Sequence, residues 1–71
     1  MEKLQKVTRE AFGLNASFPL DPTTRLKELP GWDSMNSVNL EIAIETAFHI
    51  DRSKFTLGDE VTLAELHAQL L

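Results

Sequence analysis

The sequence contains no cysteine, no apolar stretch of the signal-peptide type near residue 1 and no long apolar run. The absence of cysteine excludes a disulfide framework and a thiolate metal site. The first six residues lack the apolar core of a signal peptide, and no apolar run approaches the length of a membrane span. We therefore expect a soluble protein of the cytoplasm with no membrane partner.

Basic residues are scarce in the second part of the chain. Residues 31–71 hold two basic and seven acidic side chains, a net charge of −5. Residues 1–30 hold five basic and four acidic side chains, a net charge of +1. Together they give the formal net charge of −4. Such a charge repels phosphates, so it argues against nucleic acid and favours partner proteins with basic surfaces.

The length limits how much apolar surface the chain can bury. The 71 residues predict one domain, residues 1–71, and a domain of this size buries only about 60% of its unfolded surface. A hydrophobic content of 42% and a charged content of 25% are ordinary for a globular domain. We expect a monomer of modest stability.

A stretch in the middle of the chain organises the rest. Pro30 and Gly31 mark a turn, since neither suits a helix interior. Asp33 can then cap a helix, because its carboxylate can accept hydrogen bonds from the free amides of the first turn. No glycine or proline interrupts residues 35–48, which predicts a helix of about four turns. Ser34 lies at its first position, where outward amides and the helix dipole favour negative charge.

This predicted helix is apolar on two opposite sides. At about 100° per residue, the two apolar stripes lie roughly 165° apart. Glu41 and Glu45 fall between the stripes, next to the second. A surface helix normally needs one stripe, so the helix is either buried on both sides or keeps one face for partners. The first stripe contains Leu40, Ile44, Ala47 and Phe48, and the second contains Met35, Val38 and Ile42.

Two more helices and two short elements surround this stretch. Residues 2–12 predict a helix that ends before Gly13. Residues 13–33 then form a long first loop, with a single helical turn expected at 24–29. The inward residues of the first helix are Leu4, Val7, Ala11 and Phe12, and the apolar anchors of the loop are Leu14, Phe18, Leu20, Leu26 and Leu29.

The chain ends in a short element and a final helix. Residues 52–55 predict a short helix or an irregular turn. Thr62 and Glu65 form a capping box, which predicts the start of the last helix. Its inward residues are Leu63, Leu66 and Leu70.

The tripeptide Asp33-Ser34-Met35, preceded by Gly31-Trp32, resembles the signature of the acyl and peptidyl carrier proteins. That signature is Asp-Ser-Leu, often Asp-Ser-Met, at the start of an apolar and acidic helix. The resemblance covers nearly the whole chain, since length, acidity and helix order agree with it. It implies an all-α fold, a small four-helix bundle of three main helices plus one short helix, with a long first loop.

The resemblance also implies a function. It places 4′-phosphopantetheine on the hydroxyl of Ser34, and the thiol of this arm would hold an acyl or aminoacyl group as a thioester. The implied protein is a substrate carrier without catalysis of its own. Its implied partners are a phosphopantetheinyl transferase that uses coenzyme A, a loading ligase or acyltransferase, and downstream synthases. The phosphodiester would lie where helix amides support its charge, and the rest of the arm would project into solvent.

The same resemblance assigns the second stripe to partner enzymes. Asn36 and Asn39 stand where acidic residues are common in the family, which favours a dedicated pathway over general recognition by fatty-acid enzymes. The cargo and pathway, whether fatty acid, polyketide, peptide or cell-surface, are left open. The implied partner-binding residues are Met35, Val38, Glu41, Ile42 and Glu45.

Other interpretations of these residues have a physical basis. Ser34 could stay unmodified in a small helical adaptor that binds partners through the second stripe. A nucleophilic Ser34 would need an oriented base and an oxyanion hole, and the sequence lacks the second glycine of a nucleophile elbow. His49 and His67 match no metal-ligand spacing. Trp32 is expected either to anchor the loop or to contact the arm or a partner.

Overall fold

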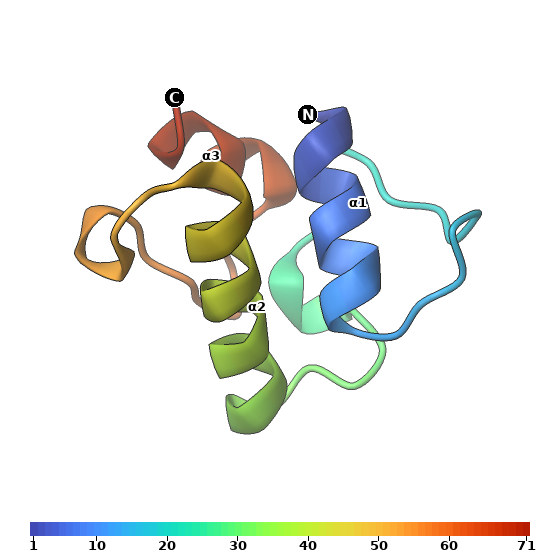
Figure 1. The fold of residues 1–71 in the computed structure, drawn as a ribbon. Coiled ribbons are helices and arrows are strands. Elements are labelled where there is room, and N and C mark those ends of the chain that lie inside the picture. Colours follow the sequence, from blue (N-terminus) through green and yellow to red (C-terminus); the bar gives the residue numbers. More distant parts are fainter.

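The computed structural model describes residues 1–71, which form three α-helices and two single 3₁₀ turns. Helix α1 spans Glu2–Ala11, α2 spans Ser34–Phe48 and α3 spans Leu63–Gln69, and the 3₁₀ turns are η1, Leu26–Glu28, and η2, Arg52–Lys54. No strand forms, so the all-α prediction is confirmed (Figure 1). None of the helices has both the length and the hydropathy that a membrane crossing requires.

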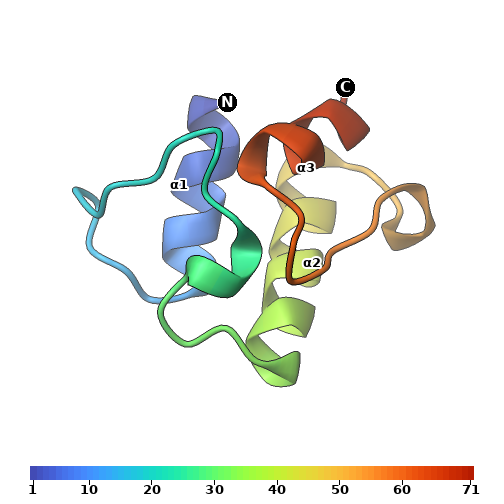
Figure 2. The same ribbon diagram turned by 180° about the vertical axis from the view of Figure 1, so that it is seen from behind.

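The arrangement of the helices places the start of α2 at one end of the molecule. Helices α1 and α2 lie side by side and run in opposite directions (Figure 1). Helix α3 lies at the end where α1 begins and α2 ends (Figure 2). The long connection after α1 passes along the outer side of that helix and returns through η1 to the start of α2. The first residue of α2, Ser34, is thereby presented away from α3.

One apolar cluster holds these elements together. It contains nine buried side chains, contributed by the three helices, by η1 and the residue after it, and by the residue that follows η2. The predicted loop anchors Leu26 and Leu29 belong to it, whereas Leu14, Phe18 and Leu20 are half-buried. The cluster consists of Leu4, Val7, Leu26, Leu29, Leu40, Ile44, Phe55, Leu63 and Leu66.

The first stripe of α2 is buried less completely than the sequence predicts. Leu40 and Ile44 have no solvent-exposed surface. Phe48, which is expected in the core together with Leu40 and Ile44, is only half-buried and packs against the cluster, so this prediction is wrong in degree; Ala47 is likewise half-buried. The reason is position, because the last turn of α2 lies at the periphery. There the ammonium of Lys3 lies 4.8 Å from the ring centroid of Phe48.

The end of the first loop pairs with the segment that precedes α3. The amide of Leu26 donates to the carbonyl of Val61 (2.9 Å), and the amide of Leu63 donates to the carbonyl of Thr24 (3.0 Å). An isolated antiparallel bridge joins Arg25 to Thr62 between these bonds. This pairing could not be predicted from the sequence, because its partners are more than thirty residues apart.

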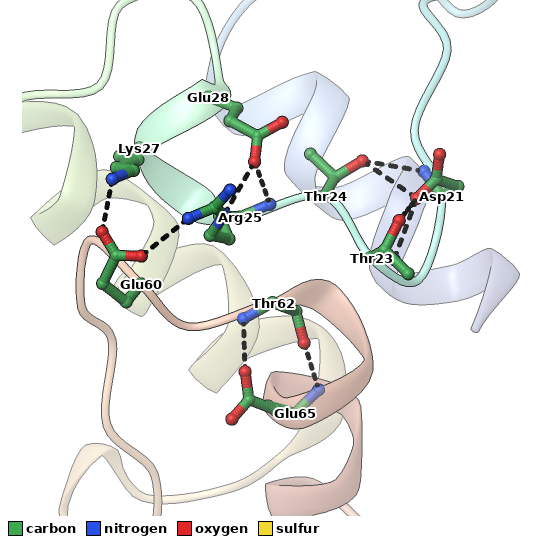
Figure 3. A network of polar contacts seen from close by, with 9 residues as sticks. All are labelled: Asp21, Thr23, Thr24, Arg25, Lys27, Glu28, Glu60, Thr62 and Glu65. Carbon is green, nitrogen blue, oxygen red and sulfur yellow. Dashed lines mark hydrogen bonds and ion pairs between the residues drawn. The ribbon is translucent and has the colours of Figure 1, made fainter.

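Ion pairs reinforce the same junction (Figure 3). The carboxylate of Glu60 accepts from Nη1 of Arg25 (2.9 Å) and from Nζ of Lys27, and Nε of Arg25 also donates to Glu28 (3.1 Å). All four side chains remain largely exposed, so each pair stabilises the fold only slightly.

The start of α3 has the capping box that the sequence predicts (Figure 3). The hydroxyl of Thr62 accepts from the amide of Glu65 (3.1 Å), and the carboxylate of Glu65 accepts from the amide of Thr62 (3.0 Å). These two bonds satisfy amides that the helix itself leaves free.

The ion pairs predict a pH dependence of stability. Hydrogen bonds from Lys27 and then Arg25 hold the pKa of Glu60 below its ordinary value of 4.5. A carboxyl whose pKa is lower in the folded chain stabilises the fold above its ordinary pKa, and this contribution disappears as the pH falls through the folded value. We expect Glu60→Gln to lower the free energy of unfolding slightly at neutral pH and not in acid.

Urea titrations at low salt would measure this difference. The matched control is Glu10→Gln on α1, an exposed carboxyl without an ion pair. An equal loss of stability from Glu60→Gln at neutral and at acid pH would contradict the electrostatic explanation.

Candidate functional site

A tight turn leads the chain into α2. Gly31 has a φ of +85°, a left-handed conformation that glycine adopts without strain. Its carbonyl accepts from Nδ2 of Asn36 (2.7 Å), and the amide of Trp32 donates to the carbonyl of Leu29 (3.1 Å). A Cβ atom at Gly31 would lie 3.3 Å from that same Asn36 nitrogen. The turn is therefore fixed from the buried Leu29 on one side and from α2 on the other.

Asp33 caps α2, as the sequence predicts. Its backbone is extended, and its Oδ1 accepts from the amide of Asn36 at 2.7 Å. Its carbonyl accepts the first main-chain bond of the helix, from Ser37 (2.9 Å). The cap sets the beginning of α2 at Ser34 and leaves the free amides of the first turn at this end of the molecule.

Ser34 presents a free hydroxyl. The residue is exposed, its carbonyl accepts from the hydroxyl of Ser37 (2.9 Å), and its own hydroxyl makes no hydrogen bond within the protein. His49 caps the opposite end of α2, about 20 Å away at 1.5 Å per residue. The other histidine, His67, is hydrogen-bonded to the amino group of Met1 before the start of α1. The Ser34 oxygen is thus open to an external reagent and has no imidazole beside it.

Trp32 is anchored by contacts on two sides. Its ring stacks on that of Phe12 with centroids 6.2 Å apart and an interplanar angle of 17°. Its Nε1 donates to Oδ1 of Asp59 at 2.8 Å. The anchoring interpretation of Trp32 is confirmed, and the anchor comes from both the end of α1 and the junction before α3.

An open hollow of about 310 Å³ lies beside Ser34. Trp32 is the one hydrophobic residue that lines it, and the other lining residues are aspartates and serines. Sequence reasoning missed two of its residues, Ser37 and Asp59. Asp59 reaches the site only through the pairing of distant segments, so no local signal could reveal it. The lining residues are Trp32, Asp33, Ser34, Ser37 and Asp59.

The second stripe of α2 faces solvent. Met35 is 73% exposed, Val38 44% and Ile42 49%, whereas the first stripe faces the core. The alternative that α2 is buried on both sides is therefore wrong. The exposed stripe begins immediately after Ser34, so the hydroxyl and the apolar surface share one helix.

The two acidic residues beside this stripe differ in their surroundings. Glu41 and Glu45 are both half-buried. Arg52 of η2 places its Nη1 3.8 Å from Oε2 of Glu41, a contact that the sequence did not predict. Glu45 has no ion pair. Of the two, Glu45 is the more available to a basic partner.

Comparison of the chain with protein-family models, curated proteins and solved structures gave no match. The interpretation of the site therefore depends on its residues and geometry. The site combines the capped start of α2, the exposed hydroxyl of Ser34, the anchored indole of Trp32 and the apolar second stripe of α2.

Proposed function

We propose that this chain is a carrier whose Ser34 holds 4′-phosphopantetheine, and that the arm carries an acyl or aminoacyl group as a thioester. The observation that carries the proposal is the exposed, unbonded hydroxyl of Ser34 at the capped N-terminus of α2. Free amides and the positive end of the helix dipole support a phosphodiester at this position. The resemblance of Asp33-Ser34-Met35 to the carrier signature supports the same function.

The modification is a phosphoryl transfer from coenzyme A. The oxygen of Ser34 forms a bond to the phosphorus that carries pantetheine, and the pyrophosphate bond of coenzyme A breaks. Adenosine 3′,5′-bisphosphate leaves, and the hydroxyl proton passes to a base. Because no imidazole lies near Ser34, the transferase supplies that base. An open position on the protein surface suits a hydroxyl that another enzyme must reach.

The proposal extends to the fold and to the partners. In this proposal, the three α-helices and η2 would be the three main helices and the one short helix of a carrier bundle. The transferase, the loading ligase or acyltransferase, and the synthases would contact the exposed stripe of Met35, Val38 and Ile42. A cytoplasmic location and a monomeric state belong to the same proposal.

Intact-protein mass spectrometry tests the modification. The purified chain would be incubated with coenzyme A and a broad-range phosphopantetheinyl transferase, and we expect a gain of one phosphopantetheine. The exposed stripe also suits the second candidate, a helical adaptor with an unmodified serine. An unchanged mass under conditions that modify a known carrier would exclude the carrier and favour the adaptor.

The acidic border of the exposed stripe predicts a salt-dependent rate of modification. Glu41→Lys combined with Glu45→Lys should slow the transferase, because the reversed charges repel its basic surface. Added salt should reduce the difference by screening. Glu45→Lys alone should account for most of the effect, since Arg52 already offsets the charge of Glu41.

Initial rates at low and high salt would measure this effect. The control with the same net charge is Glu2→Lys combined with Glu10→Lys, both exposed on α1. Ile42→Asp should slow the reaction by a similar factor at both salt concentrations, because it places a charge in an apolar contact. Wild-type rates for both α2 variants would show that the stripe is not the recognition surface.

A further inference from the structure

The hollow beside Ser34 has one rigid apolar wall. The indole of Trp32 is held by stacking on Phe12 and by its bond to Asp59, so two independent contacts fix its orientation. A flat aromatic surface of this kind binds branched alkyl groups without having to order itself first. The wall is in place before any ligand arrives.

The remaining walls accept hydrogen bonds and offer few donors. Oδ1 of Asp33 accepts from the amide of Asn36, and Oδ1 of Asp59 accepts from Nε1 of Trp32. The second carboxylate oxygen of each aspartate has no hydrogen-bond partner within the protein. The hydroxyl of Ser37 already donates to the carbonyl of Ser34. An anion would be repelled here. The occupant that fits is uncharged, has an apolar face and carries N–H or O–H donors.

We infer that the hollow binds the pantoyl segment of the arm, the part that follows the phosphate. This inference rests on the proposed modification of Ser34. The two methyl groups of the pantoyl unit would pack on the indole of Trp32, and its hydroxyl and the amide N–H would donate to Asp59. The phosphodiester stays outside the acidic hollow, at the amides of the first turn of α2.

Size and tethering favour this occupant. The hollow of about 310 Å³ lies at the lower end of the range of roughly 300–1,000 Å³ for ligand sites. Ser34 itself lines the hollow, so an arm attached there is present at an effective concentration in the millimolar range or above. Weak contacts are then sufficient to hold it. The first part of the arm lies against the protein, and only the thiol end projects into solvent.

Nuclear magnetic resonance of the modified chain tests the inference directly. Intact mass first establishes that the arm is attached. We then expect cross-relaxation between the pantoyl methyl protons and the ring protons of Trp32, and an upfield shift of both methyl signals caused by the ring current. We also expect the modified chain to lose part of the acrylamide quenching of Trp32, which is the only tryptophan.

The outcomes separate the inference from the proposed function. Modification without methyl–indole cross-peaks, and with quenching unchanged, would overturn the inference and leave the carrier intact. No gain in mass would overturn both. In the modified chain, Asp59→Asn keeps an acceptor for the indole but removes the carboxylate, so quenching should return toward the unmodified level. The control Asp21→Asn, in an exposed turn outside the hollow, should behave as wild type.

Discussion

We expect the replacement of Ser34 by alanine to abolish the gain in mass that we propose for the wild-type chain in the presence of coenzyme A and a transferase. The reason is chemical, because the phosphodiester requires the oxygen of this side chain. The hydroxyl makes no hydrogen bond within the protein, and the residue is exposed. Its removal therefore leaves the cap at Asp33 and the packing of α2 unchanged, and alanine suits a helix at least as well as serine.

The control for this experiment is Ser53→Ala. Ser53 is also exposed, and it lies two residues after an aspartate, Asp51, whose carboxylate accepts from the amide of Ser53 at 2.8 Å. We expect this variant to be modified like the wild type. Circular dichroism would verify that both variants are folded. Persistent modification of Ser34→Ala, at whatever residue, would contradict the assignment of the arm.

The second large effect concerns stability. Leu40→Ala should lower the free energy of unfolding by about 2–5 kcal/mol, because the side chain is completely buried and its removal leaves a cavity. This loss is a large part of the roughly 5–15 kcal/mol that stabilises a folded domain. Ile42→Ala should have a much smaller effect, since Ile42 lies on the other side of α2 and is 49% exposed.

Denaturant titrations of the two variants would measure the difference. The comparison is internal to one helix: both substitutions raise helix propensity, Ile42→Ala by a few tenths of a kcal/mol more, and the larger difference between them is in burial. Phe48→Ala should fall between them, below the loss of about 3–5 kcal/mol for a fully buried phenylalanine, because Phe48 is half-buried. Equal losses at Leu40 and Ile42 would show that the second stripe is buried in solution.

The parts of the fold that follow from short-range chemistry could be predicted from the sequence. Asp33 caps α2 and Thr62 caps α3 because a carboxylate or hydroxyl at these positions satisfies free amides a few residues away. The two faces of α2 follow from helical spacing, although spacing alone could not tell which face meets solvent. The structure settles that question, since Leu40 is buried and Met35 is exposed.

The parts that depend on distant segments could not be predicted. The bond from Trp32 to Asp59, the ion pair of Glu41 with Arg52, and the pairing of Arg25 with Thr62 each need the folded chain. None has a periodic or capping signal. As a result, the start of α2 at Ser34 could be predicted from the sequence, but the hollow beside Ser34 and the ion pair of Glu41 with Arg52 could not.

The junction between the first loop and the segment before α3 has a consequence for the order of events during folding. The amide of Leu26 and the carbonyl of Thr24 gain their main-chain partners only when residues 61–63 are present, and the indole of Trp32 gains its hydrogen bond only when Asp59 is present. Contacts over such sequence separations form late, because a long stretch of chain must first be closed. During synthesis, α1 and α2 can meet before residues 59–63 emerge. The surroundings of Ser34 are therefore completed only after residues 59–63 have been made.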